Sequence, residues 1–250
     1  MIQYKKIRER DPEMPKYKDI ARKLIRKIDS DDMKQGDKLA SIEELMKYFD
    51  VGKNTIIQVL TLLERQGYIY QVRGSGNFVR KHRRHGYINL LEANGFKSTL
   101  QGFRLGSEML DLKVIKPTTE VMANLDISED EDVYYVKRLR SIEGRKFAIE
   151  KSFYVKDIVP YLNQEIVEDS IFRYLVEDLK LKPGFTDHFF RVGKLNKENA
   201  ALLNLKIGDP AAFLESIYYL ENGRPFDYSK ILYHYEEAQF FIQGASNTEF

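Results

Sequence analysis

The first 80 residues carry three short helical patterns in succession, each followed by a turn signal, and this order restricts the possible folds more than any other feature of the sequence. Apolar residues recur at helical spacing over residues 17–28, which predicts an amphipathic helix. Ser41 precedes Glu44 by three residues, the spacing of a capping box, and predicts a short second helix that ends at Phe49. A third helix is predicted over residues 53–65, directly after a tight turn.

A hairpin pattern follows the third helix. Two short strands are predicted over residues 68–72 and 77–79, around the glycine-rich turn at residues 73–76. Helix, helix, turn, helix and hairpin is the order of a winged helix-turn-helix, whose third helix enters the major groove and whose wing approaches the phosphates. An ordinary solvated helix face at Lys53 and Gln58, beside a plain hairpin turn, remains the alternative. The predicted DNA contacts are Ser41, Lys53, Asn54, Thr55, Gln58, Arg73, Gly74, Ser75 and Gly76.

The charges are divided unevenly along the chain. The whole chain has a net charge of +2, whereas residues 1–85 contain 20 Lys and Arg against 12 Asp and Glu, a net charge of +8. Residues 86–250 contain 20 against 26, a net charge of −6. A basic module followed by a larger acidic one favours a polyanionic partner for the first module and a different role for the second.

Several classes of protein are excluded. The chain has no cysteine, which excludes a disulfide scaffold, thiolate metal sites and a cysteine nucleophile. No apolar run approaches the roughly 18 residues of a membrane span, so we expect a cytoplasmic protein without a membrane partner. The charged run at residues 81–86 predicts a linker between domain 1–80 and domain 87–250. His82 and His85 in this run do not predict a metal site, and no cofactor is predicted.

Residues 87–250 contain one pattern twice, with an offset of 78 or 79 positions. Residues 144–147 match residues 223–226, for example. Each copy predicts a strand, a short helix and two strands joined by a hairpin turn. Two copies predict an antiparallel sheet with helices, an α+β domain, with chance similarity as the alternative.

An arginine pair marks a candidate binding site in this domain. Arg138 and Arg140 are two residues apart on a predicted strand, so both side chains leave the same face and suit an anion. If the hairpin loop has three residues with Gly144 in the left-handed conformation, Arg138 lies opposite Glu150 and Arg140 opposite Ala148. A two-residue loop would place Arg138 and Glu150 on opposite faces. An arginine–glutamate pair on a solvated sheet face is the alternative to a ligand site.

Residues 39–45, 51–56 and 67–79 resemble the DNA-binding domain of GntR-type bacterial transcriptional regulators. Two positions depart from the family pattern, because Glu43 and Ile57 stand where arginines are usual. Of the usual basic trio that faces DNA only Lys53 remains. Ile57 is instead suited to contact a thymine methyl group.

Beyond the linker the chain resembles the UTRA effector-binding domain of the HutC branch of this family, which is similar in fold to chorismate lyase. The resemblance implies a homodimer and a small molecule, bound by the C-terminal domain, that changes DNA binding. Phe172 replaces a usual tyrosine, and Ile88 and Asn89 stand where a Thr/Ser pair holds phosphate. The positions that match effector contacts in UTRA domains that bind sugar phosphates are Arg138, Arg140, Glu150, Ser170, Asp227 and Tyr233.

We therefore predict a sequence-specific transcriptional repressor rather than an enzyme. Its predicted partners are a double-stranded DNA operator, a second copy of the chain, and a sugar phosphate or other anionic metabolite. A chorismate lyase-like enzyme and a DNA-binding protein without an effector are the alternatives. The sequence contains no Gly-x-Ser-x-Gly, Walker or His-Glu-x-x-His motif, which weighs against the enzyme.

Overall fold

The computed structural model describes residues 15–30, 33–80, 86–89, 100 and 103–242. The chain divides into two compact units, Met1–Arg84 and His85–Phe250. His82, His85 and all of the predicted linker except Gly86 lie outside the described residues.

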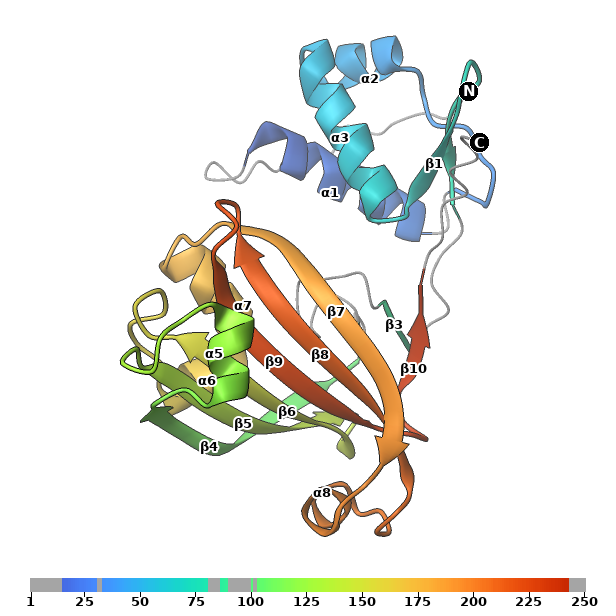
Figure 1. The fold of residues 1–250 in the computed structure, drawn as a ribbon. Helices are drawn as coiled ribbons and strands as arrows, with labels where there is room; N and C mark the ends of the chain where they lie inside the picture. Colours follow the sequence, from blue (N-terminus) through green and yellow to red (C-terminus); the bar gives the residue numbers. More distant parts are fainter. Residues whose placement is uncertain (1–14, 31–32, 81–85, 90–99, 101–102, 243–250) are drawn as a thin grey trace, which may run out of the picture. The chain divides into compact units, whose positions relative to one another are not determined.

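The N-terminal unit is a winged helix-turn-helix, as predicted (Figure 1). Its elements are α1 (Lys16–Asp29), α2 (Ile42–Phe49), α3 (Lys53–Arg65), β1 (Ile69–Val72) and β2 (Gly76–Val79). The apolar faces of the helices share one core, in which Leu24, Leu45, Ile56 and Leu63 are almost fully buried. Each such side chain contributes about 1.5–3 kcal/mol to folding by its removal from water. This shared core holds α2 and α3 against each other.

The wing is anchored by a third segment of backbone. The Leu39 amide donates to the Asn77 carbonyl at 2.8 Å, and the Val79 amide donates to the Asp37 carbonyl at 2.8 Å. The rings of Tyr70 and Phe78 stack with their centroids 5.7 Å apart. The hairpin is therefore held at its base.

The C-terminal unit is built on one six-stranded antiparallel sheet with the order β4-β5-β6-β9-β8-β7 (Figure 1). A separate parallel pair joins β3 and β10. The elements are β3 (Tyr87–Asn89), β4 (Leu105–Ile115), α5 (Thr119–Leu125), β5 (Val133–Ile142), β6 (Arg145–Val155), α6 (Gln164–Asp169), α7 (Ile171–Arg173), the π-helical turn η1 (Tyr174–Asp178), β7 (Pro183–Lys194), α8 (Lys197–Leu203), β8 (Pro210–Leu220), β9 (Pro225–His234) and β10 (Gln239–Phe241).

This sheet consists of two copies of one unit. The orders β4-α5-β5-β6 and β7-α8-β8-β9 are the same, and β6 and β9 lie side by side at the centre. The helix of each unit is capped by a side chain, Thr118 in the first and Asn196 in the second, 78 residues apart. Each helix also ends in a left-handed residue, Asp126 in the first and Asn204 in the second, again 78 residues apart. The repeat predicted from the sequence is thus present in the structure.

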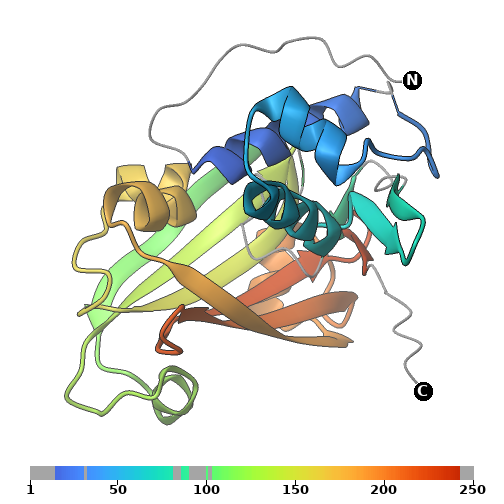
Figure 2. The ribbon, with the colours of Figure 1, turned by 90° about the horizontal axis from the view of Figure 1, so that it is seen from above.

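The two faces of the sheet are covered differently (Figure 2). α5 and α8 pack on one face through Val121 and Leu203. On the opposite face α6, α7 and η1 cover one end around Val167, and β3 covers the other end around Ile88. The polar side chains described below lie on this second face, between the two apolar clusters.

The longest helix that the structure describes, α1, has 14 residues and carries charged side chains along one face. None of the described helices is suited to span a membrane.

Candidate functional site

The N-terminus of α3 is exposed. Gly52 caps the helix without a side-chain hydrogen bond, and no acidic residue lies in the first turn of α3. The first turn of α2, by contrast, contains two glutamates. The positive end of the α3 dipole is therefore not neutralised by the helix itself and is suited to an anion. Lys53, Asn54 and Gln58 are exposed on this helix, and Thr55 is half-buried.

Ile57 lies on the same helix and is 42% exposed. An exposed apolar side chain is not stabilised by contact with water, unlike the polar side chains around it. Its position, four residues after Lys53, places it on the same face of α3. Ile57 is thus available to a partner surface.

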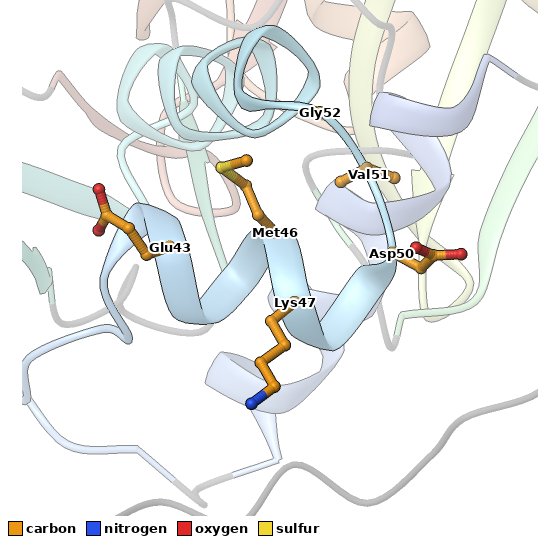
Figure 3. A pocket seen from close by; sticks show the side chains of 6 residues that line it. All are labelled: Glu43, Met46, Lys47, Asp50, Val51 and Gly52. Carbon is orange, nitrogen blue, oxygen red and sulfur yellow. The ribbon is translucent and has the colours of Figure 1, made fainter.

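A hollow of about 510 Å³ lies beside the turn between α2 and α3 (Figure 3). Glu43 and Lys47 project from α2 at its rim, and Asp50 lies at the turn. Two carboxylates against one ammonium make this hollow unsuited to a polyanion. This hollow is therefore not part of the candidate DNA surface.

Ser41 and the wing complete the set predicted for DNA. The Ser41 hydroxyl accepts from the Glu44 amide at 3.2 Å, and Glu44 accepts from the Ser41 amide at 2.8 Å, which is the predicted capping box. These bonds lower the pKa of Glu44. The tip of the wing, from Arg73 to Ser75, is exposed, and Gly74 has a φ of +77° that other residues rarely adopt.

The hairpin that carries the arginine pair differs from the expected one. Its turn has two residues, Glu143 and Gly144, both with positive φ, rather than three. The expectation that such a turn separates Arg138 from Glu150 is wrong, because Phe147 forms a β-bulge. The one extra residue shifts the register back. Phe147 is buried against Tyr233, with the ring centroids 5.6 Å apart, which explains why the bulge is stable.

Arg138 and Glu150 form a buried ion pair on the face between the two apolar clusters. The Arg138 Nη2 to Glu150 Oε1 distance is 2.6 Å, and Nη1 donates to the Val167 carbonyl at 2.9 Å. Among the described residues, Arg138 Nε has no hydrogen-bond partner. Glu150 Oε2 also has none, and its nearest cation, Arg140 Nη1, is 4.0 Å away. The two side chains are thus buried away from water, but each has one polar atom without a hydrogen-bond partner among the described residues.

A second arginine adds a further charge beside this pair. Arg140 is almost fully buried and donates to the Ser107 hydroxyl at 3.1 Å. Burial and the like charge of Arg138 lower the pKa of Arg140 to about 10, so it remains protonated at neutral pH. Tyr233 lies next to Ala148, which is opposite Arg140, and burial raises the pKa of its hydroxyl.

A row of serines links the ion pair to a buried carboxyl group. Ser152 Oγ donates to Glu150 Oε1 at 3.4 Å, and Ser229 Oγ lies 2.7 Å from Ser152 Oγ and 2.6 Å from Asp227 Oδ1. Ser229 has one hydroxyl proton for two short contacts. Both contacts are satisfied when Asp227 is protonated and donates to Ser229. Burial accordingly raises the pKa of Asp227 to about 8.

The cluster is therefore cationic at neutral pH. Burial opposes ionisation of Glu150, but the charges of Arg138 and Arg140 lower its pKa, so it is ionised. Asp227 is protonated below about pH 8. Two arginines and one ionised carboxylate give the described part of this buried site an excess of positive charge, which suits an anion.

The structure brings together five of the six predicted effector residues on one sheet face, namely Arg138, Arg140, Glu150, Asp227 and Tyr233. Ser170 makes no hydrogen bond to this group within the part of the chain that the structure describes. Its hydroxyl accepts from the Arg173 amide at 3.3 Å and caps α7, three residues after Val167. Asn89 and Ile88 are buried on β3. Among the described residues, no group of three His, Asp or Glu side chains could hold a metal ion.

Several members of the polar row were not predicted from the sequence. Ser152, Ser229, Ser216 and His188 occupy one cross-strand row of β6, β9, β8 and β7, and His188 Nδ1 lies 2.8 Å from Ser216 Oγ. Burial lowers the pKa of His188. The sequence feature that could have revealed this row is the alternation of polar and apolar residues along its strands. Because neither face of the central strands β6 and β9 is open to solvent, the polar residues had to face a buried polar site.

The comparisons with known proteins agree with both units. Residues 16–79 match the family described as bacterial regulatory proteins, gntR family, and residues 100–239 match the UTRA domain. The HTH-type transcriptional regulator YydK of Bacillus subtilis is 52% identical over 233 residues, which are 93% of this chain and 99% of YydK. The crystal structure of YydK matches with a TM-score of 0.81 over 93% of this chain and 100% of that chain.

More distant relatives belong to the same class. The HTH-type transcriptional regulator GmuR of Bacillus subtilis is 29% identical, over 86% of this chain and 92% of GmuR. The mannosyl-D-glycerate transport/metabolism system repressor MngR of Escherichia coli is 26% identical, over 91% of this chain and 95% of MngR. These proteins are transcriptional regulators and not enzymes, and this chain is a transcriptional regulator of the same kind. It belongs to the gntR family of bacterial regulatory proteins, with a UTRA domain as its C-terminal unit.

Proposed function

We propose that this regulator is a repressor whose DNA affinity is controlled by an anionic, polyhydroxylated metabolite bound at the Arg138 cluster. GntR regulators bind DNA operators and UTRA domains bind small-molecule effectors. MngR is named as a repressor, which supports repression here. The observation that carries the proposal is the buried Arg138 Nε, which has no hydrogen-bond partner among the described residues, beside a second buried arginine, Arg140.

An anion is the ligand that this cluster favours. A buried guanidinium N–H that lacks a hydrogen-bond partner is destabilising, and an entering phosphate or carboxylate oxygen can accept a hydrogen bond from it. Arginine guanidinium groups bind such oxygens with two parallel hydrogen bonds. A bound ligand therefore stabilises the conformation in which β5 holds Arg138 and Arg140 at this site. An effector favours one state of the protein by binding more tightly to that state.

Hydroxyl groups of the ligand have partners in the same cluster. Glu150 Oε2 has no partner among the described residues and can accept a hydrogen bond from a ligand hydroxyl. The compound in the name of MngR, mannosyl-D-glycerate, combines a carboxylate with sugar hydroxyls. We propose a ligand of this class or a sugar phosphate. The proposed contacts are Arg138, Arg140, Glu150, Ser170, Asp227 and Tyr233.

We propose that DNA is read by the N-terminal turn of α3 and approached by the wing. The exposed and uncapped N-terminus of α3 supports this role, as does the exposed tip of the wing. The proposed contacts are Ser41, Lys53, Asn54, Thr55, Gln58, Arg73, Gly74, Ser75 and Gly76. We further propose a homodimer through residues 87–250, because one winged helix covers too few base pairs for selective regulation.

The test begins with the selection of DNA fragments that the full chain binds from a random pool. The proposal predicts a pseudo-palindromic sequence. Sugar phosphates and sugar carboxylates are then added to the complex at fixed DNA concentration. A compound of this class should release the DNA and raise the melting temperature of the free protein without being converted. Turnover of the compound would instead support an enzyme, and an absence of response across both classes would support a DNA-binding protein without this effector.

A further inference from the structure

The polar row beside the Arg138 cluster ends on β7, an edge strand of the sheet. Ser152, Ser229, Ser216 and His188 lie opposite one another on β6, β9, β8 and β7, in that order. The three serines are buried, whereas His188 is half-buried. Among the described strands, β7 pairs with β8 alone. His188 is therefore the member of the row that a molecule can reach from the edge of the sheet.

The His188 ring is held in one orientation, and only one of its nitrogens is occupied. Nδ1 lies 2.8 Å from Ser216 Oγ, and the ring meets Tyr218 edge to face with the centroids 6.3 Å apart. None of the described residues forms a hydrogen bond with Nε2. A neutral imidazole has one donor and one acceptor nitrogen, so the bond to Ser216 leaves Nε2 with the other role. A ligand hydroxyl group, which both donates and accepts, suits Nε2 in either tautomer.

Aromatic side chains line this row on both sides. Phe190, two residues after His188 on the same face, packs on Phe240 with the centroids 5.5 Å apart. Phe240 packs in turn on Tyr233 at 4.8 Å. Tyr218 lies on the other side of the row, in the apolar cluster around Val167. Small-molecule sites combine such walls with a few polar groups, and sugar rings suit them because their faces carry C–H groups and their edges carry hydroxyls.

The separation of the two ends of this face limits the size of a ligand that contacts both. Arg138 extends from β5 to Glu150 on β6. Three strand spacings, about 14 Å, separate β6 from β7 in the sheet. Two linked sugar rings with one anionic group match this length better than a single ring does.

We propose that His188 is a second anchor of the effector, whose Nε2 binds a hydroxyl group of a second sugar ring while the anionic group of the ligand binds at Arg138 and Arg140. The inference rests on the effector site proposed above and narrows its ligand to anionic disaccharides. Ser216 has a positioning role, because its bond to Nδ1 fixes the direction in which Nε2 points. His188 thereby determines specificity for the length of the ligand.

Calorimetry on the full chain tests the length first. The probes are glucose 6-phosphate and the 6-phosphates of sucrose, maltose, cellobiose and trehalose, which differ in the linkage between the rings. At least one of the two-ring compounds should bind about tenfold more tightly than glucose 6-phosphate, the ratio expected when one hydrogen bond and the burial of a second ring are added.

Two substitutions then separate the roles of the two nitrogens. His188→Asn keeps an amide where Nδ1 contacts Ser216 and removes Nε2, whereas His188→Gln places an amide where Nε2 lies. His188→Asn should weaken binding of the preferred two-ring compound about tenfold and binding of glucose 6-phosphate less than about twofold. His188→Gln should keep most of the wild-type preference. Asp187→Asn is the matched control, because Asp187 is exposed on the opposite face of the same strand, and it should change neither affinity.

A purely structural role for His188 predicts the reverse order. His188→Gln, which loses the Ser216 contact, would then have the lower melting temperature, and both variants would keep the wild-type preference among ligands. That result would overturn the inference, as would a wild-type protein that binds glucose 6-phosphate as tightly as every two-ring compound. The proposed effector site would survive both outcomes. A wild-type protein that binds neither class of sugar phosphate would overturn the inference and the sugar-phosphate effector together.

Discussion

Arg138 on β5 and Glu150 on β6 lie directly opposite each other, with Nη2 and Oε1 2.6 Å apart, and they do so only because Phe147 is an extra residue in β6. A regular two-residue hairpin would have placed them on opposite faces of the sheet. The bulge therefore creates the buried pair around which the proposed effector site is built.

Loss of one partner of this pair should destabilise the C-terminal unit. Arg138→Met leaves the Glu150 carboxylate buried without its closest cation, and such changes cost about 3–5 kcal/mol. Urea unfolding measures the change. Arg145→Met is the control on the same hairpin, because Arg145 is exposed and pairs with Glu237 at the surface, and it should change stability by less than about 1 kcal/mol. A cost for Arg138→Met as small as that of the control would show that the pair is not desolvated in solution.

Asp227 should make stability depend on pH. Burial raises its pKa from the usual 3.8 to about 8, so the folded protein keeps a proton that the unfolded chain releases above about pH 4. The contribution of Asp227 to stability therefore falls as the pH rises from 4 to 8 and is constant above 8. Asp227→Asn carries no such proton. The melting temperature of the variant minus that of the wild type should increase between pH 5 and pH 8, and a difference independent of pH would contradict the assignment.

Lys53 should contribute to base recognition. Lys53→Ala is expected to weaken specific DNA binding by roughly 1–3 kcal/mol and nonspecific binding by less. Arg65→Ala is the control, since Arg65 lies about 18 Å away at the other end of α3. Fluorescence anisotropy with the selected operator and a scrambled duplex distinguishes the two effects. Equal losses on both duplexes would make Lys53 a phosphate contact.

Ile57 should make an apolar contact with DNA at the position where the family usually has an arginine. Ile57→Arg restores the arginine usual in the family and should steepen the slope of log affinity against log salt by about 0.9 if it reaches a phosphate. Ile57→Ala should leave that slope unchanged and reduce the preference for thymine at one operator position. Val114→Ala, at 43% exposure on β4, controls for the loss of an exposed apolar side chain. An unchanged base preference in Ile57→Ala would exclude the methyl contact.

The helices and hairpins could be predicted from local patterns. The capping box at Ser41 and the third helix over Lys53–Arg65 are confirmed, because a cap and an apolar stripe are determined by residues within a few positions. The repeat of strand, helix and two strands was also visible, because each copy brings its own turn signals. These features need no information from distant parts of the chain.

The register at the arginine pair could not be predicted correctly from the turn alone. Phe147 is bulged because its ring packs on Tyr233, a residue of β9 that is 86 positions away in the sequence. The serine row has the same origin, since Ser152 and Ser229 meet only when β6 pairs with β9. Such contacts follow from tertiary packing, which local patterns do not encode.

The central claim is that a ligand at Arg138 controls DNA affinity, and the most direct test is the operator affinity of wild type and Arg138→Gln with and without an effector found by the metabolite screen. Saturating effector should weaken wild-type operator binding about 5–150-fold, and operator DNA should weaken effector binding by the same factor. Arg138→Gln, tested at a temperature at which circular dichroism shows it folded despite its lower stability, should bind the operator normally without effector and show no response to it, while Arg145→Gln responds as the wild type does. An Arg138→Gln protein that still responds at the same effector concentration would contradict the account.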